Sequence, residues 1–346
     1  MAEHLKPSRR RLVIGFVLSL LIVGLLVVVL DWRSVGRVLG ETDWRLVLVA
    51  LFFTAISYAC LGISFAVASR IFEIRMRLRD LSAIGFVSAN LNYLLSSAGA
   101  AGFSVRFLLM LDQGATARDI VAASVFDGYV NGLGLLALLA VGLGYLFLNH
   151  RLSPGLSAAT GITAGLLVAL LLLATALIFV GSLRTAVLRA LGTAARRLVR
   201  RDLTATMNDF DAAMSRGVTV MQGQPLLLVL LIALAVADWI VSAAALWFCF
   251  DALGDPISVG VLLTGFGVGV TAGTLSMVPG GLGVQEGSMA GVYALLGVPL
   301  QEGVLASILF RVVYYLIPFI ISLAFYWWLL RQLAHPKMKS RVLEER

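Results

Sequence analysis

Charge is scarce in this chain. Only 13% of its 346 residues are charged, whereas 60% are hydrophobic and the mean hydropathy is +0.96. This composition excludes a soluble globular protein and is typical of an integral membrane protein. No stretch between apolar segments exceeds about 45 residues, which is too short for a typical folded domain. We therefore predict a single membrane domain over residues 1–346.

Cysteine and histidine are scarce as well. Cys60 and Cys249 both lie in apolar segments, which favours packing over a disulfide or a metal pair. His4, His150 and His335 lie outside the apolar segments and form no metal-ligand cluster. We expect no cofactor. The formal net charge of +8 comes from basic residues that flank apolar segments, so the charge favours lipid headgroups over nucleic acid as a partner.

Six apolar segments have the length of a membrane span. They are residues 12–30, 44–69, 120–148, 156–180, 226–250 and 304–330. The first is too long for a signal peptide, so we expect a retained helix. With both termini in the cytoplasm, the inside segments hold 21 Lys and Arg and the outside loops hold 4. This bias predicts a multi-pass protein of the bacterial cytoplasmic (inner) membrane with both termini inside.

Two further apolar segments, 81–111 and 257–297, fit this topology only if neither crosses the membrane. Each is interrupted near its middle, the first by the serine- and glycine-rich residues 96–102. We predict two opposed re-entrant helical hairpins. The expected fold class is therefore an all-α polytopic membrane protein with six full spans and these two hairpins.

The two halves of the chain repeat this order. A shift of 183 residues relates span, hairpin and span at 44–148 to span, hairpin and span at 226–330, with opposite orientation. Such inverted repeats with broken helices are typical of secondary transporters. The connector 181–224 has apolar residues at helical spacing and many arginines, which predicts one or two interfacial helices. It either recruits anionic lipid or fixes topology and connects the halves.

The second interruption is the most informative motif. Residues 278–287 read Val-Pro-Gly-Gly-Leu-Gly-Val-Gln-Glu-Gly. The residues expected to break the helix are Pro279, Gly280, Gly281, Gly283 and Gly287. Broken backbone at membrane depth is tolerated only inside protein or beside a watery cavity, and the Glu286 carboxylate at that depth is costly. The motif therefore predicts a transport or ligand site.

With this motif followed by Gly297 and Arg311, the chain resembles the transmembrane, flippase-like region of lysylphosphatidylglycerol synthases and their stand-alone relatives, over about residues 12–330. In the first half, Asn92, Gly102 and Arg106 fit the family's Gly-Glu-x-x-Arg-like region. Phe103 stands where an acidic residue is often seen, and Asp127-Gly128 where a Glu-Arg pair is common.

The resemblance implies a lipid-handling protein. In the synthases a separate soluble domain performs the aminoacylation. This chain ends at Arg346, shortly after the last apolar segment, so we expect a stand-alone member that is not an enzyme.

Five charges interrupt apolar sequence. They are Arg106, Asp127, Asp238, Glu286 and Arg311. Each half carries one cation and one anion. In the first half the cation lies on the hairpin and the anion on the following span, and in the second half this order is reversed. A guanidinium forks onto phosphate oxygens, so Arg106 or Arg311 could hold a lipid phosphate in a polar cavity that Asn92 extends. The alternative is that the charges form structural ion pairs that fix the hairpins.

We expect a flippase that moves an anionic or polyprenyl-linked lipid between leaflets, with the lipid phosphate as its partner chemistry. Two alternatives stay open at this point. One is an enzyme or accessory subunit of lipid-linked envelope biosynthesis, and the other is a non-catalytic membrane scaffold.

Overall fold

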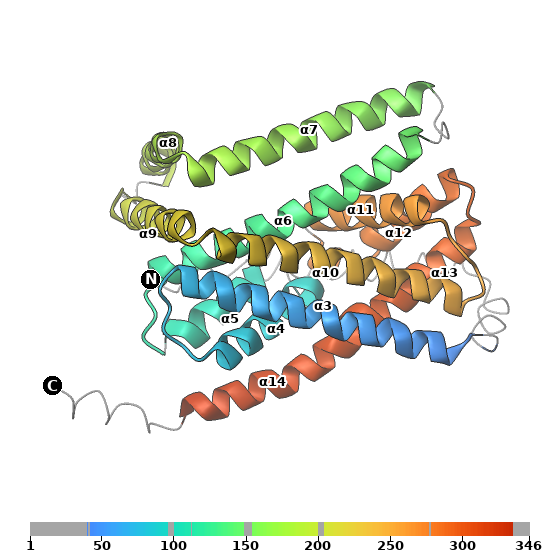
Figure 1. The fold of residues 1–346 in the computed structure, drawn as a ribbon, viewed down its shortest axis with the longest axis horizontal. Helices are drawn as coiled ribbons and strands as arrows, with labels where there is room; N and C mark the ends of the chain where they lie inside the picture. The colour runs from blue at the N-terminus through green and yellow to red at the C-terminus, as the bar shows by residue number, and fades with distance from the viewer. Residues whose placement is uncertain are drawn as a thin grey trace.

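The protein is described here from a computed structural model, which defines Gly40 and residues 42–95, 100–111, 113–148, 154–199, 204–276 and 278–334. These residues form helices and connecting turns and contain no strand, which confirms the all-α prediction (Figure 1). The helices are α3 (Trp44–Ile71), α4 (Leu78–Leu95), α5 (Ala100–Leu111), α6 (Ala117–Leu148), α7 (Pro154–Phe179), α8 (Gly181–Val199), α9 (Thr204–Gly223), α10 (Pro225–Ala252), α11 (Val259–Leu275), η1 (Pro279–Gly281), α12 (Val284–Leu295), α13 (Leu300–Phe310), the π-helical turn η2 (Arg311–Leu316) and α14 (Ile317–Ala334).

Local sequence explains several helix boundaries. Asp43 begins α3 as an N-cap, and its carboxylate accepts a hydrogen bond from the Arg45 amide at 2.9 Å. Pro225 occupies the first turn of α10, where backbone amides make no intrahelical hydrogen bond, so proline costs none there. The Asp43 amide donates to the Ala252 carbonyl, so the start of α3 and the end of α10 meet at one end of the molecule.

The order of helices repeats along the chain. Helices α3, α4, α5 and α6 correspond to α10, α11, α12 and the run α13–η2–α14, and corresponding helices begin 181–184 residues apart. Helix α3 lies along α10. Helix α4 packs against α14 of the other half, and α11 packs against α6. These contacts are reciprocal between the two halves. Their opposite orientation in a membrane stays a prediction.

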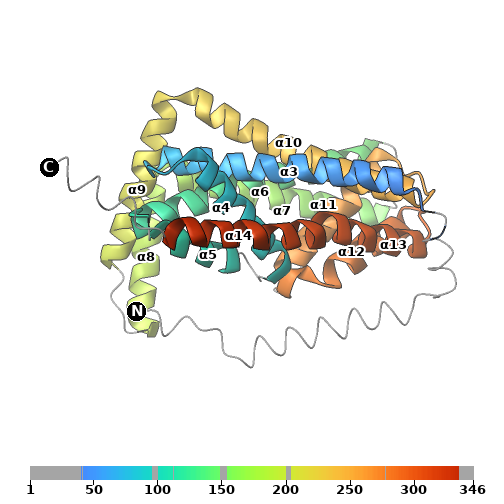
Figure 2. The same cartoon turned by 90° about the horizontal axis from the view of Figure 1, so that it is seen from below.

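The paired helices α4–α5 and α11–α12 lie in opposite halves of the molecule (Figures 1 and 2). The pair α4–α5 begins and ends near α8 and α9, and we name this the connector end. The pair α11–α12 begins and ends near the Asp43–Ala252 contact, which we name the far end. That these hairpins enter the membrane without crossing it stays a prediction.

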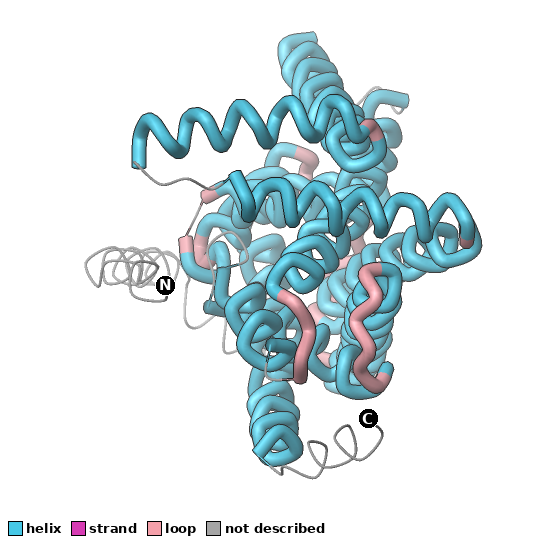
Figure 3. Tube along the Cα trace, turned by 90° about the vertical axis from the view of Figure 1, so that its left-hand side faces the viewer, coloured by secondary structure: helices cyan, strands magenta, loops and turns pink. Residues whose placement is uncertain are grey.

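The connector 181–224 forms two helices that lie across the connector end (Figure 3). Helix α8 leaves α7 at an angle of 96°. Buried Arg184 fixes this corner, because its guanidinium donates to the Ile178 carbonyl, Asp211 and Ser215. Arg216 donates to Asp119 at 2.9 Å and so ties α9 to the start of α6.

Four helices of the described residues are long and apolar enough to cross a membrane, or five if the bent α7–α8 pair forms one span. Their outer faces are apolar, as lipid requires: Leu226 is 77% exposed and Leu48 66%. The predicted span 12–30 lies outside the described residues, as do residues 96–99 of the first interruption.

Three sequence predictions about glycine are wrong. Gly287 lies inside α12 and Gly102 inside α5, because these helices begin at Val284 and Ala100, ahead of the glycines. The spacing of Gly128 and Gly132 in the sequence also predicts tight helix packing, but no neighbouring atom lies within 4 Å of a Cβ at either position.

Close packing occurs instead between α11 and α12. A Cβ on Gly265 would lie 2.0 Å from the Tyr293 ring, and one on Gly269 would lie 2.0 Å from Met289. The side chains of α12 therefore fill the notches that glycine leaves on α11.

Candidate functional site

The turn between α11 and α12 has the broken backbone that the motif predicts. Gly280, Gly281 and Gly283 adopt positive φ angles of 62°, 61° and 77°, which favour glycine. The Glu286 carboxylate then accepts a hydrogen bond from the Gly283 amide at 2.7 Å and caps the start of α12. The glycines thus bring a buried carboxylate to a helix N-terminus.

Arg311 lies opposite this carboxylate. Its Nε donates to Glu286, forming an ion pair, and its Nη1 donates to the Gly280 carbonyl at 3.0 Å. The guanidinium also lies 5.0 Å from the centroid of the Tyr315 ring. Glu286 and Arg311 therefore lie within hydrogen-bonding reach, as expected for two opposite charges buried in apolar sequence. Among the described residues, the buried Arg311 Nη2 has no hydrogen-bond partner, so a ligand could accept hydrogen bonds from this nitrogen.

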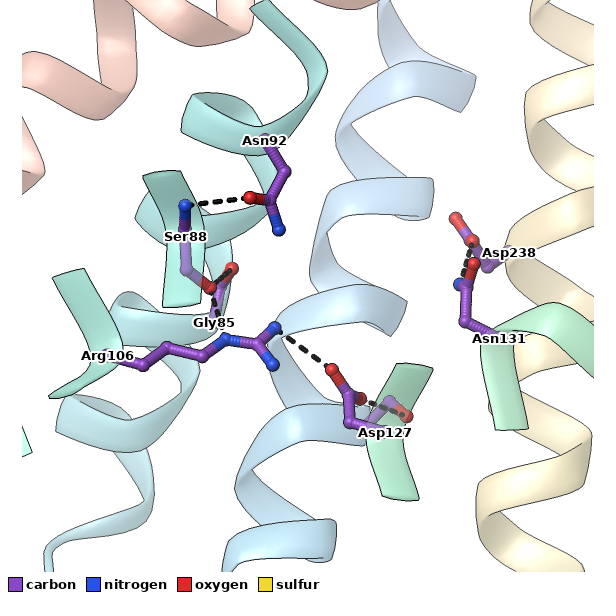
Figure 4. A network of polar contacts seen from close by, with 9 residues as sticks. Gly85, Ser88, Asn92, Arg106, Asp127, Asn131 and Asp238 are labelled. Carbon is purple, nitrogen blue, oxygen red and sulfur yellow. Dashed lines mark hydrogen bonds and ion pairs between the residues drawn. The ribbon is translucent and has the colours of Figure 1, made fainter. Parts of the chain in front are cut away.

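The first half holds the reciprocal pair (Figure 4). Arg106 on α5 donates through Nη2 to Asp127 on α6 at 2.9 Å, and through Nε to the Ser88 hydroxyl at 2.7 Å. Its guanidinium lies 3.9 Å from the centroid of Phe65, a cation–π contact. Ser64 donates weakly to Asp127 at 3.4 Å. The sequence predicts Arg106 and Asp127, but nothing in its pattern singles out Ser88 or Phe65.

Asn92 joins α4 to α5. Its Oδ1 accepts a hydrogen bond from the Gly102 amide at 2.7 Å. A Cβ at Gly102 would lie 2.2 Å from the Ser88 carbonyl oxygen, so only glycine allows this approach. Asn92 therefore positions the helix that carries Arg106.

The two hairpins meet near the middle of the molecule. A Cβ on Gly280 would lie 2.7 Å from the Leu94 carbonyl oxygen and 2.9 Å from that of Tyr93. The glycine-rich turn of the second half thus lies against the end of α4. Pro279 begins this turn, and Gly281 lies against Gly273 of α11.

A third polar group lies between the halves. Asp238 on α10 is 2% exposed and accepts hydrogen bonds from the Ser57 hydroxyl and, at 3.4 Å, from the Asn131 side chain. Ser57 also shares a hydrogen bond with the Tyr314 hydroxyl at 2.6 Å. Among the ion pairs of the described residues, none includes Asp238. This carboxyl therefore faces neutral hydrogen-bonding groups.

The π-helical turn η2 carries both Arg311 and Tyr314, and sequence reasoning missed it. The signal was Pro318, which has no amide N–H to donate to the Tyr314 carbonyl one turn earlier. Tyr58 supplies a donor in place of the missing amide, since its hydroxyl donates to the Tyr314 carbonyl at 2.9 Å. Such π turns often lie at functional sites.

Two apolar grooves lie on either side of this polar centre. Groove 1, with a volume of about 490 Å³, lies between α3, α4 and α14, and Tyr58 and Arg79 line it. Groove 2, with a volume of about 450 Å³, lies between the corresponding helices α10, α11 and α6, and Trp239 lines it. Groove 1 extends toward the connector end and groove 2 toward the far end.

A row of polar contacts runs from one groove to the other. From Tyr58 it passes through Tyr314, Ser57, Asp238 and Asn131, whose backbone carbonyl accepts from the Trp239 indole N–H at 3.0 Å. We name this row, which lies at the seam between the halves, the polar wall.

Comparison with known proteins gives one family. A family model for the lysylphosphatidylglycerol synthase TM region matches residues 12–322. A UPF0104 membrane protein of Methanothermobacter thermautotrophicus is 31% identical over 86 residues, which cover 25% of this chain and 24% of that protein. A phosphatidylglycerol lysyltransferase of Staphylococcus aureus (strain COL) is 30% identical over 86 residues, which cover 25% of this chain and 10% of that protein. The matched stretch thus spans a quarter or less of these relatives.

Proposed function

The chain belongs to the lysylphosphatidylglycerol synthase TM region family, and from this premise we propose that it moves an anionic or polyprenyl-linked lipid between membrane leaflets. The family relates it to membrane phospholipids, and the apolar helices make it a multi-pass membrane protein. Its substrate would have a phosphate in its headgroup and apolar chains.

The arrangement of the grooves carries this proposal. Groove 1 and groove 2 are both apolar, lie between corresponding helices and extend toward opposite ends of the molecule. Apolar grooves suit lipid chains, and the polar wall between them suits a headgroup. A scaffold needs no such pair of grooves. A transporter with alternating access needs one for each leaflet, with a closed wall between them.

The charged pairs supply the headgroup chemistry. Arg106 and Arg311 each hold a carboxylate, and either could exchange it for a lipid phosphate, which a guanidinium binds equally well. Asp127 and Glu286 would then close the site again after the lipid leaves. Gly280, Gly281 and Gly283, with Pro279 before them, keep the backbone open beside Arg311. Asn92 positions the helix that carries Arg106.

Leaflet exchange in liposomes of the purified protein tests the proposal, with labelled anionic phospholipid and labelled polyprenyl phosphate as probes. We expect Arg106→Ala to abolish exchange and Arg106→Lys to reduce it in part, because lysine keeps the charge but loses the fork. The matched control is Arg45→Ala, which removes an exposed arginine at the start of α3. Full exchange by a folded Arg106→Ala protein would leave Arg106 as a structural partner of Asp127.

The orientation belongs to the same proposal. We place both termini and the connector on the cytoplasmic side of the bacterial inner membrane, because 21 Lys and Arg fall on that side and 4 on the other. Labelling of single cysteines from outside the cell measures it. Position 116 at the connector end should stay unlabelled, and position 255 at the far end should react.

One observation favours a second candidate. The Staphylococcus aureus relative is named a lysyltransferase, so this chain could instead serve as a membrane subunit for a lipid-modifying enzyme. That role predicts a stable complex with such an enzyme and no lipid exchange by the purified chain alone.

A further inference from the structure

We propose that Asp238 is a proton-binding site that couples lipid movement to a proton gradient, with one proton travelling in the same direction as each anionic headgroup. This inference rests on the proposed transport function and adds an energy source to it. It follows from the difference between Asp238 and the other two interior carboxylates.

The difference lies in the partners. Asp127 and Glu286 each have an arginine, whereas the hydrogen bonds that Asp238 accepts within the described residues come from the neutral groups of Ser57 and Asn131. An ionised carboxylate buried without a cation is strongly disfavoured, and such a group takes up a proton instead. Asp238 is thus the interior carboxyl for which a bound proton removes most of the penalty.

The hydrogen-bond chain can serve either protonation state. With Asp238 ionised, the Tyr314 hydroxyl donates to Ser57, and Ser57 donates to the carboxylate. With Asp238 protonated, its own O–H donates to Ser57, and Ser57 donates to the Tyr314 hydroxyl. Both hydroxyls can donate and accept, so uptake of one proton reverses two hydrogen bonds without moving a heavy atom. Release of the proton restores the first arrangement.

The surroundings of Asp238 contain other titratable groups but no basic partner among the described contacts. The titratable groups close enough to interact with it electrostatically are Tyr58 and Cys60 of α3, Tyr93 of α4, Asp127 of α6 and Tyr314 and Tyr315 of η2. Helix α11 has no titratable residue. Glu302 of α13 lies near Asp255 at the far end, and α9 places Asp211 and Arg216 in ion pairs at the connector end. Asp127 is itself paired with Arg106.

The position of Asp238 explains the coupling. It lies in the wall between groove 1 and groove 2, which a headgroup must pass. A carboxylate there repels a phosphate, whereas a neutral carboxyl does not. Passage of an anionic headgroup therefore requires a protonated Asp238, and the proton leaves on the side that the lipid reaches. The π turn links this event to the second half, because it carries both Tyr314 and the Arg311 that binds Glu286.

The test uses liposomes of the full-length protein with a labelled anionic phospholipid and an imposed pH gradient. Chemical quenching of the label in the outer leaflet measures its distribution. We expect an acidic exterior to shift the lipid toward the inner leaflet several-fold, and collapse of the gradient with a protonophore to reverse the shift. In Asp238→Asn the distribution should not respond to the gradient. The matched control, Asp251→Asn on the same helix, changes a carboxylate that binds Trp247 and should respond as the wild type does.

The outcomes separate this proposal from the transport function. Exchange that ignores the gradient in the wild type overturns the coupling and leaves transport intact. If no lipid moves under any condition, the transport function fails. Infrared spectroscopy in detergent then tests whether Asp238 binds a proton, because it detects a protonated carboxyl directly. A titrating carboxyl band that is present in the wild type and in Asp251→Asn but absent in Asp238→Asn supports the site, and its presence in all three overturns it. Ser57→Ala, which keeps the carboxyl, should shift that band.

Discussion

The two halves of the molecule neutralise their buried charges in opposite ways. In the first half the cation, Arg106, lies on the hairpin and the anion, Asp127, on the long helix after it. In the second half the anion, Glu286, lies on the hairpin and the cation, Arg311, on the helix after it. The architecture therefore requires one ion pair at this place in each half but does not fix its polarity.

The two arginines also differ in the contacts they make besides the ion pair. Arg106 keeps a hydrogen bond to Ser88 and a contact with Phe65 besides its carboxylate. Arg311 has the Gly280 carbonyl and a more distant aromatic ring, and its buried Nη2 has no partner in the part of the chain that the structure describes. We infer that the second pair depends more strongly on its carboxylate, and the following predictions test this difference.

The largest effect is expected for Glu286→Gln. It leaves the Arg311 guanidinium buried without a counter-charge, which should lower the free energy of unfolding by about 3–5 kcal/mol. The double variant Glu286→Gln, Arg311→Met removes both charges and should be more stable than Glu286→Gln alone. Denaturation in mixed detergent micelles, as a double-mutant cycle, measures the coupling. Additive effects would show that the two residues are energetically independent.

The turn beside this pair comes next. Gly280→Ala places a Cβ on a backbone with a φ of 62°, 2.7 Å from the Leu94 carbonyl oxygen, so we expect a loss of about 2–3 kcal/mol. The matched change is Gly287→Ala in the same segment, where the helix is regular and nothing lies within 4 Å. It should stabilise the protein by about 0.5–1 kcal/mol. Equal effects at the two positions would contradict the left-handed turn.

The first pair should be more tolerant. Asp127→Asn keeps the Ser88 and Phe65 contacts of Arg106, so we expect a loss of about 1–2 kcal/mol, smaller than that of Glu286→Gln. The same denaturation assay compares the two. A larger loss for Asp127→Asn would reverse the ranking of the pairs.

The smallest effect concerns the seam between the halves. Tyr58→Phe removes the hydroxyl that donates to the Tyr314 carbonyl, and interhelical hydrogen bonds of this kind contribute about 0.6 kcal/mol on average. The loss should appear in both Tyr58→Phe and Tyr58→Leu, with the leucine variant losing ring contacts as well. No loss in the phenylalanine variant would mean that another group satisfies the carbonyl.

Much of the fold could be predicted from composition and charge. The span at Trp44–Ile71 and the glycine-rich turn at Pro279–Gly281 follow from apolar length and from residues that cannot continue a helix. The pairing of Glu286 with Arg311 follows from the cost of a buried charge. The structure places both as expected, while the re-entrant and inverted arrangement in a membrane remains a prediction.

The polar centre could not be predicted, for a physical reason. Ser57, Tyr58 and Tyr314 are ordinary residues in apolar helices, and only the packing of α3 against α10 and η2 brings them to Asp238. Gly102 was misassigned for a related reason. Its need for a small residue comes from a close approach to α4, and not from a break in its own helix.

The notched packing of α11 on α12 has a mechanical consequence. Tyr293 and Met289 fit against Gly265 and Gly269, and the side chains that flank these glycines would block them if α12 slid along α11. We therefore expect α11 and α12 of the second hairpin to tilt together as a rigid body. It would turn about the contact between Gly280 and the end of α4, where the backbones of the two hairpins lie against each other.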